Sequence, residues 1–321
     1  MSLVGMPPVL VIAYRRKDQL LTILEKCKEN SISRIYIALD GPKEGNAHAI
    51  SENFQIRDAI KDFQRNFPGH VSILFRDQNV GCAASCLSAC DWIFNNEKNA
   101  IILEDDCIPS NDFFTFARTS IEAMEKNENI WLACGTQFAP KDIIHSPWIL
   151  SKYALIWGWV TSKKNWLEIS SAMKIGNPVR SNLGISPWER IYWNEGARRA
   201  HDGWKDVWDT ILLQQLIANQ KFAILPKAPL VSNVGNDHVA THTFGESPWI
   251  NLKTERFFDP STPPAPLLNA DQWLQKKFYR IAIRHIVTTR ITYFVDLLNR
   301  KNIPLKPMLF RWDSANADHR D

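Results

Sequence analysis

The stretch AIILEDD, residues 100–106, places three acidic side chains directly after a short apolar run. Such a run, bounded by polar residues, is typical of a β-strand buried on both faces of a parallel sheet. In open parallel sheets, ligands gather at the carboxyl ends of the strands, where loops carry polar groups over a rigid scaffold. The stretch therefore predicts a central strand that ends in a functional acidic loop formed by Glu104, Asp105 and Asp106.

The residues before this stretch alternate between apolar strands and amphipathic helices. Strands are predicted at residues 7–13, 34–39 and 71–75, and helices at about 18–24, 56–66 and 83–94. A β-α-β-α-β-α-β series of this kind predicts an α/β fold whose first half, about residues 1–129, is a Rossmann-like nucleotide-binding unit.

Charged or polar residues follow each of the other predicted strands as well. They are Arg15 and Arg16, then Asp40, then Arg76, Asp77 and Asn79. Because parallel strands end at one edge of a sheet, we expect these side chains and the acidic loop to face a single crevice.

From about residue 130 the pattern becomes mixed and rich in tryptophan. Strands are predicted at residues 130–134, 154–160 and 223–226, and a helix at 206–218. We expect this part, about residues 130–260, to form a mixed-sheet half that binds the acceptor, that is, the second substrate of a transfer reaction. Both halves would then make one domain over residues 1–260.

A proline-rich break at residues 260–266 precedes a C-terminal extension, residues 261–321. Apolar and basic residues over 271–301 predict a basic amphipathic helix. Two interpretations stay open: the helix packs on the domain, or it lies on an anionic membrane as a peripheral contact.

The composition is that of an ordinary globular protein. A net charge of +4 and a pI near 8.7 are too mild to indicate nucleic acid as the main partner. An apolar stretch of membrane-spanning length and a secretory leader are both lacking, so the expected location is cytoplasmic. Cys82, Cys86 and Cys90 share helical spacing, which favours packing against a sheet over a zinc cluster.

The three adjacent acids carry a specific chemical expectation. Neighbouring carboxylates repel each other at a sheet end, and a divalent cation removes that cost. Their hard oxygens suit Mn²⁺ or Mg²⁺, which keep waters and bind substrate phosphates. We expect Asp106, helped by Asp105 or Glu104, to hold such a cation. A solvated turn that caps the next helix, or a metal-dependent phosphohydrolase, remains an alternative.

The stretch IILEDDCIPSNDFF, residues 101–114, resembles the metal-binding segment of the N-acetylglucosaminyltransferase I family. That family has the GT-A fold, inverts the anomeric carbon and depends on manganese. Residues 8–13 with Arg16 resemble its first strand and nucleotide-contacting arginine, and IALDG, residues 37–41, resembles the loop whose aspartate, here Asp40, contacts the uracil. The resemblance covers residues 8 to about 245 in scattered blocks.

Two further blocks lie in the second half. A Gly-Trp segment that lines the family's sugar site is similar to Trp157, Gly158 and Trp159. The family's Trp-Asp-Asp element, which supplies the catalytic base, resembles the Trp-Asp pair ending at Asp209. Here Thr210 follows in place of the second acid. The resemblance thus implies that Asp209 is the general base, which suits a carboxylate in a partly desolvated cleft.

A second resemblance concerns residues 230–242, LVSNVGNDHVATH, which look like bacterial family 2 glycosyltransferase-like proteins that end in a Gly-Thr-His element. It implies that His242 touches the diphosphate or the metal. Farther upstream, Asp202, Asp206 and Asp209 have the spacing of one helix face. For Asp202 and Asp206 we expect a solvated acidic surface.

These observations predict an inverting, metal-dependent glycosyltransferase of bacterial polysaccharide biosynthesis. It would move a hexosyl or N-acetylhexosaminyl group from a nucleotide sugar, with UDP expected, to a hydroxyl of a glycan or lipid-linked acceptor. A non-catalytic protein that binds nucleotide sugars or glycans on the same fold is the alternative from another functional class.

Overall fold

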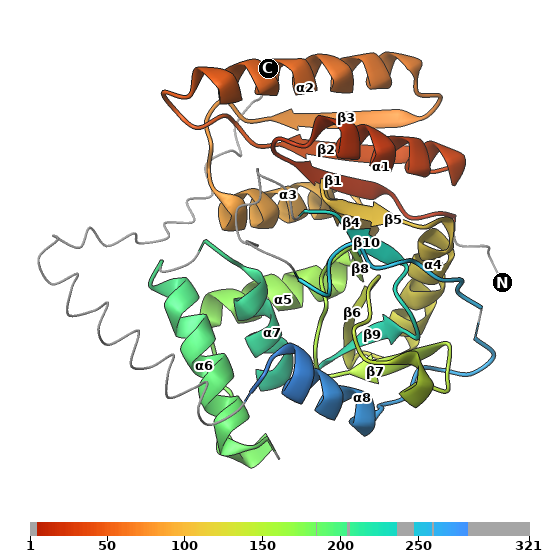
Figure 1. Ribbon diagram of the computed structural model, residues 1–321, viewed down its shortest axis with the longest axis vertical. Coiled ribbons are helices and arrows are strands. Elements are labelled where there is room, and N and C mark those ends of the chain that lie inside the picture. The colour runs from red at the N-terminus through yellow and green to blue at the C-terminus, as the bar shows by residue number, and fades with distance from the viewer. Residues whose placement is uncertain (1–4, 184, 204–205, 236–246, 259, 282–321) are drawn as a thin grey trace, which may run out of the picture.

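The chain folds around one eight-stranded mixed β-sheet (Figure 1). The computed structural model describes residues 5–183, 185–203, 206–235, 247–258 and 260–281. In chain order the strands of this sheet are β1 (Val9–Ala13), β2 (Arg34–Leu39), β3 (His70–Phe75), β4 (Asn99–Glu104), β6 (Ile130–Cys134), β7 (Trp148–Ser151), β8 (Trp159–Ser162) and β9 (Phe222–Pro226). Their order across the sheet is β3-β2-β1-β4-β8-β6-β9-β7.

The first four strands form the Rossmann-like half. β1 pairs in parallel with β2 and β4, and β2 pairs in parallel with β3. All of β1 is buried, with Val9 and Val11 facing one core and Leu10 and Ile12 the other. The expectation of parallel strands buried on both faces is therefore confirmed for β1 and β4, whereas β3 at the edge of the sheet is only partly buried.

Helices cover both faces of the sheet. One face packs against α1 (Lys17–Glu29), α2 (Ala47–Asn66) and α4 (Asn111–Lys126). The opposite face packs against α3 (Cys82–Asn96), α5 (Lys163–Ile175), α6 (Pro187–His201), α7 (Asp209–Ala218) and α8 (Leu268–Trp273). Cys86 and Cys90 on α3 are buried in this second layer, and all six cysteines are free thiols.

The second half of the sheet is mixed. β8 is antiparallel to both β4 and β6, β6 is parallel to β9, and β7 is antiparallel to β9. A separate antiparallel pair joins β5 (Cys107–Pro109) to β10 (Val231–Asn233), which carries the chain after residue 231 to the acidic loop. The α/β prediction of a Rossmann-like half joined to a mixed half is confirmed, and it is the architecture expected of a GT-A fold.

Several predicted helix and strand limits differ from those observed. α2 begins at Ala47, well before residue 56, because Asn46 accepts a hydrogen bond from the backbone nitrogen of Ala49 at 2.9 Å and caps the helix. The strand predicted at 154–160 lies at 159–162 instead. α6 ends at His201 and α7 begins only at Asp209, so Asp202, Asp206 and Asp209 do not share a helix face as expected.

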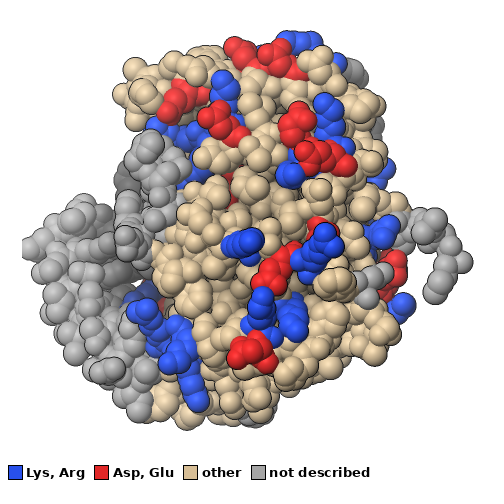
Figure 2. Space-filling view, turned by 45° about the vertical axis from the view of Figure 1, so that its right-hand side comes forward, with Lys and Arg blue, Asp and Glu red and all other residues tan. Residues whose placement is uncertain are grey.

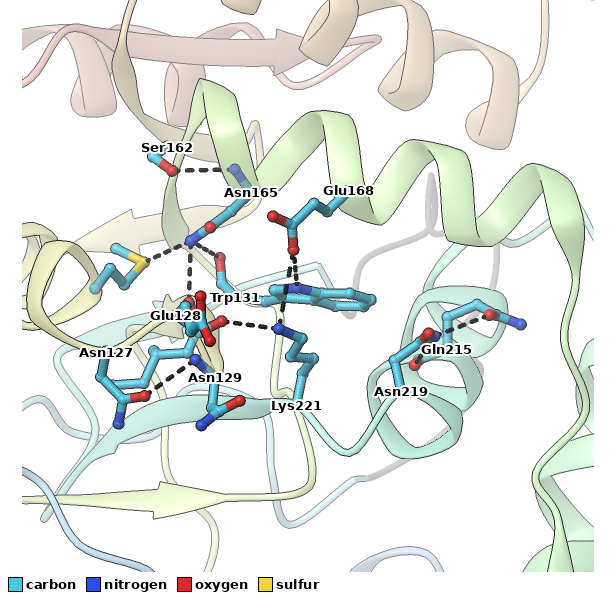
Figure 3. A network of polar contacts seen from close by, with 12 residues as sticks. Asn127, Glu128, Asn129, Trp131, Ser162, Asn165, Glu168, Gln215, Asn219 and Lys221 are labelled. Carbon is cyan, nitrogen blue, oxygen red and sulfur yellow. Dashed lines mark hydrogen bonds and ion pairs between the residues drawn. The ribbon is translucent and has the colours of Figure 1, made fainter.

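A polar network fastens α5 to β6 (Figure 3). The side-chain nitrogen of Asn165 donates to the carbonyl of Trp131 at 3.0 Å, and the Trp131 indole donates to Glu168 at 3.1 Å. Ser162 caps α5 by accepting from the backbone nitrogen of Asn165. Ser162 pairs with Asn99, the first residue of β4, so this network lies at the end of β4 opposite the acidic loop.

The described part of the C-terminal extension packs on the second half. Leu274 is fully buried, and Pro266 bridges to Leu150. After α8 the chain forms one π-helical stretch, η3 (Leu274–Phe278), and Arg280 has a φ of 50°. The continuous helix predicted from 271 is therefore wrong, because the helix ends at Phe278. Residues 282–321 lie outside the described part of the chain.

The surface carries mixed charge. On the face shown in Figure 2, Lys and Arg side chains lie among Asp and Glu side chains. This distribution agrees with the modest net charge of +4. Within the described residues, every helix is too short or too polar to span a bilayer.

Candidate active site

A cavity of about 890 Å³ opens at the carboxyl ends of β1, β2 and β4. One wall of the cavity comes from the Rossmann-like half and includes Arg16, Asp40 and the acidic loop. The opposite wall includes Trp157 and Asp209. Strand ends that meet in one crevice are the usual ligand site of an open α/β sheet. The structure thus brings most of the predicted polar residues of both halves to one place. Arg76 and Asp77 are exceptions, because Arg76 binds Ser85 and Ser88 on α3 and Asp77 is exposed, so neither lines the cavity.

Asp105 is an anchor for the loop between β1 and α1. Its side chain is buried and accepts hydrogen bonds from the backbone nitrogen of Tyr14 at 2.8 Å and from the Arg16 guanidinium at 3.0 Å. These partners occupy both carboxylate oxygens. Asp105 therefore fits a structural role better than the role of metal ligand expected from the sequence.

Asp106 lies beside Arg16 and the exit of β10. Its Oδ2 is 3.5 Å from the Arg16 guanidinium, and its backbone oxygen accepts from the nitrogen of Val234 at 2.9 Å. A Cβ on Gly235 would collide with the Asp106 carboxylate, so glycine is needed there. Burial and the neighbouring Asp105 raise the pKa of Asp106, and Arg16 partly offsets this.

Glu104, the last residue of β4, lines the cavity with a half-buried side chain. Desolvation raises its pKa well above the ordinary value, and negative charge on Asp106, Asp105 and Asp209 raises it further. Carboxylates so close together favour either a shared proton or a bound cation. Glu104 is therefore part of an acidic cluster whose repulsion a divalent cation would relieve.

The donor set fits a hard cation that shares its coordination with substrate. Among the described residues, no three His, Cys, Asp or Glu side chains are grouped to form a metal cage. Mg²⁺ and Mn²⁺ at phosphate sites need only one or two carboxylates, because waters and phosphate oxygens complete the shell. Glu104 and Asp106 both line the cavity and supply such a pair.

Asp40 organises the end of the cavity that lies at the carboxyl end of β2. Its buried carboxylate accepts hydrogen bonds from the backbone nitrogens of Gly41 and Val80 and from the Asn79 amide, at 2.9, 3.2 and 2.9 Å. Burial nevertheless raises its pKa. These hydrogen bonds fix the loop before α3 against the end of β2. Asp40 also lines the cavity.

Asp209 is the first residue of α7 and faces the acidic loop across the cavity. Its Oδ1 accepts from the backbone nitrogen of Thr210 at 2.7 Å and from the Thr210 hydroxyl at 3.3 Å. A first-turn acid is also favoured by the helix dipole. The negative charge of Asp209 helps to raise the pKa of Glu104 and of Tyr192, which places all three in one electrostatic neighbourhood.

Of the segment Trp157–Trp159, which was predicted to shape the sugar site, only Trp157 lines the cavity. Trp157 packs edge-on against Phe138. Trp159 does not line it, because the side chain is 1% exposed and packs in the core between Trp166 and Trp208. Gly158 does not line it either, because it packs against Val231. His242 lies outside the described residues.

Sequence reasoning missed most of the aromatic wall on the second-half side. The residues that form it with Trp157 are Phe138, Tyr192, Trp193, Trp208, Phe278 and Tyr279. Together with Trp157 they come from five separate segments, and the ring centroids of Phe278 and Phe138 lie 4.3 Å apart. No local motif links these segments, so only their packing reveals the wall.

Asp206 is exposed, as expected from the sequence, but it also makes contacts that the sequence did not predict. Its carboxylate accepts hydrogen bonds from the backbone nitrogens of Cys82 and Ala83 at the start of α3. Asp202 is likewise exposed and pairs with Arg198 at 2.7 Å, as expected for a surface acid.

Comparison with known proteins gives structural likenesses only. No family model and no curated protein matches the chain. A solved UDP-glucose pyrophosphorylase in complex with UDP-glucose is similar at 10% identity and a TM-score of 0.38, covering 69% of this chain and 90% of that one. The inositol-1-phosphate CTP transferase of T. maritima is similar at 9% identity and 0.36, covering 70% and 86%.

A third solved structure, 4-diphosphocytidyl-2C-methyl-D-erythritol synthase of Anaerococcus prevotii, is similar at 10% identity and a TM-score of 0.33, covering 57% of this chain and 81% of that one. At identities and TM-scores this low, the three likenesses add nothing to what the site itself indicates.

Proposed function

We propose that this chain is an inverting glycosyltransferase that uses a nucleotide sugar, with UDP as the nucleotide, and Mn²⁺ or Mg²⁺. One observation carries the proposal. Glu104 and Asp106 from the end of β4 and Asp209 from the start of α7 face the same cavity, close enough for Asp209 to raise the pKa of Glu104. Acids from the two halves thus meet where a donor and an acceptor would meet.

The donor side of the cavity is suited to a nucleoside diphosphate. Arg16 places its guanidinium beside Asp106, and guanidinium groups bind phosphate oxygens strongly. Asp40 holds the loop before α3, against which the base and ribose would lie. A cation bound by Glu104 and Asp106 would neutralise the charge that develops on the leaving diphosphate.

Asp209 is suited to the role of general base. Thr210 holds one carboxylate oxygen through two hydrogen bonds, which orients the group while the other oxygen can take a proton. In the reaction the acceptor hydroxyl gives its proton to Asp209, its oxygen forms a bond to the anomeric carbon, and the bond to the diphosphate oxygen breaks. Thr210, at the position where the N-acetylglucosaminyltransferase I family carries a second acid, would therefore orient the base through these hydrogen bonds.

The acceptor would lie against the aromatic wall. Apolar faces of sugars pack well on aromatic rings, and Trp157, Tyr192 and Phe278 present such rings to the cavity. We infer a hydroxyl of a glycan or of a lipid-linked sugar as the acceptor, and a hexosyl or N-acetylhexosaminyl group as the transferred unit.

Calorimetric titration with UDP tests the donor site. Wild-type protein should bind UDP at least about tenfold more tightly in Mn²⁺ than in chelator, because cation and diphosphate complete each other's coordination. Asp106→Asn should lose this dependence, whereas Asp62→Asn, an exposed carboxylate on α2, should keep it. Equal UDP affinity of the wild type in Mn²⁺ and in chelator would contradict the proposal.

A further inference from the structure

The amino-terminal end of α3 is capped from the other half of the molecule. Its N-cap residue, Gly81, has no side chain to offer. Asp206, which precedes α7, instead accepts hydrogen bonds from the backbone nitrogens of Cys82 at 2.6 Å and Ala83 at 3.0 Å. Helix caps normally come from the residue just before the helix, so this cap links two segments that are far apart in the sequence.

Both sides of this contact are adapted to close approach. Gly81 has a φ of 89°, a conformation that favours glycine, and a Cβ there would lie 2.6 Å from the Asp206 carboxylate. On the other side of the same loop, Asp40 accepts from the backbone nitrogen of Val80 at 3.2 Å. The loop that receives Asp206 is therefore already fixed to the nucleotide half.

Asp206 stands three positions before Asp209 in the chain, and the residues between them add a second anchor. Trp208 is 3% exposed, stacks on Trp159 with ring centroids 5.7 Å apart, and accepts the backbone hydrogen bond of Leu212 in the first turn of α7. The start of α7 is thus held on one side by core packing and on the other by the α3 cap.

We propose that Asp206 is a positioning residue that fixes the distance between the two walls of the cavity and thereby holds Asp209 at the reacting oxygen. The inference rests on the proposed function of Asp209 as the base. Asp206 need not touch substrate, since both its oxygens bind α3. Loss of the contact should misplace Asp209, and a misplacement of about 1 Å can lower a rate by roughly a hundredfold.

This inference is tested by assaying four variants together, Asp206→Ala, Asp206→Asn, Ser162→Ala and Asp209→Asn, with UDP release from UDP-GlcNAc in Mn²⁺ as the rate. Asp206→Ala should lower kcat by about 10- to 100-fold while KM for UDP-GlcNAc changes by less than about threefold. Asp206→Asn keeps one acceptor oxygen and should lie between Ala and wild type. Ser162→Ala removes the N-cap of α5 at the far end of β4 and is the matched control for stability.

Hydrogen exchange supplies a readout that needs no turnover. The backbone amides of Cys82 and Ala83 should exchange faster in Asp206→Ala than in wild type or Ser162→Ala, because their acceptor is gone. The inference is wrong if Asp206→Ala matches Ser162→Ala in kcat, or if these amides keep their protection. An unchanged rate in Asp209→Asn would instead overturn the proposed function, and the role of Asp206 in it would fall with it.

Discussion

Adjacent carboxylates do different work in this molecule. Asp105 binds the Tyr14 nitrogen and the Arg16 guanidinium, whereas Asp106 faces the cavity. Burial of the charge destabilises both side chains, and the partners of Asp105 offset this more fully, because Asp106 has the Arg16 guanidinium only at 3.5 Å and the weak thiol donor of Cys107 at 3.3 Å. One acid therefore stabilises the fold, and the next is left available for a ligand.

This division predicts opposite effects on stability. Asp105→Asn removes the nearer of the two carboxylates that pair with the largely buried Arg16 and should lower the free energy of unfolding by about 2–4 kcal/mol. Asp106→Asn relieves repulsion and should change stability by less than about 1 kcal/mol. Urea unfolding of the two variants beside wild type measures both values, and equal destabilisation would contradict the division.

Residue types at the site could be predicted, but their partners could not. The acids after a buried strand are visible in the sequence, so Glu104 and Asp106 were expected at the cavity. The role of Asp105 depends on Tyr14 and Arg16, about ninety positions away, and that of Asp206 depends on backbone nitrogens of α3. Contacts between such distant segments leave no local pattern.

At the scale of elements, the segment formed by α8 and η3 completes the aromatic wall, because Phe278 and Tyr279 line the cavity. Its attachment depends on a buried polar cluster. Asp271 accepts from the Ser151 hydroxyl at 2.5 Å, and Glu189 accepts from the Tyr153 hydroxyl at 2.6 Å and from Lys152 at 2.9 Å. The buried carboxylate of Asp271 links the packing of the segment to pH.

Burial raises the pKa of Asp271 from 3.8 to about 6, although hydrogen bonds from Ser151 and Lys152 oppose the shift. A raised carboxyl pKa means that the protonated form favours folding. The contribution of Asp271 is therefore present below about pH 4 and is lost as pH rises through about 6, a change on the order of 2–3 kcal/mol.

Asp271→Asn should remove this pH dependence and be more stable than wild type at pH 7. Thermal unfolding at intervals between pH 4 and 8 measures the difference between the two proteins. Asp202→Asn is the matched control, because Asp202 is exposed and its ion pair is worth little. Parallel stability curves for Asp271→Asn and wild type would contradict the assignment.

Elements with a clear hydrophobic period were predictable, and those defined by caps or packing were not. β1 and β4 follow from apolar runs that end in charged residues. α6 was missed because its pattern is weak and its start depends on Ser186 accepting from the nitrogen of Glu189. The continuous helix predicted from residue 271 breaks after Phe278, where a π-helical stretch is followed by a positive φ at Arg280.

At the scale of the whole molecule, one sheet carries two kinds of wall. The parallel strands end in the polar groups that suit a nucleoside diphosphate, and the mixed half brings aromatic rings and Asp209 to the same cavity. The crevice was predictable because parallel strands must end together. Its far wall was not, since five segments contribute to it.

The stereochemistry of the product distinguishes inverting sugar transfer from the other reactions that this cavity could support. Wild-type protein in Mn²⁺ should convert UDP-GlcNAc to UDP, and proton NMR at early times should show the released or transferred sugar as the β-anomer, because one in-line attack inverts the α-linked donor. Asp209→Asn should keep Mn²⁺-dependent UDP binding while this conversion falls at least about a hundredfold. Formation of UMP and sugar 1-phosphate, or retention of the α-anomer, would contradict the account.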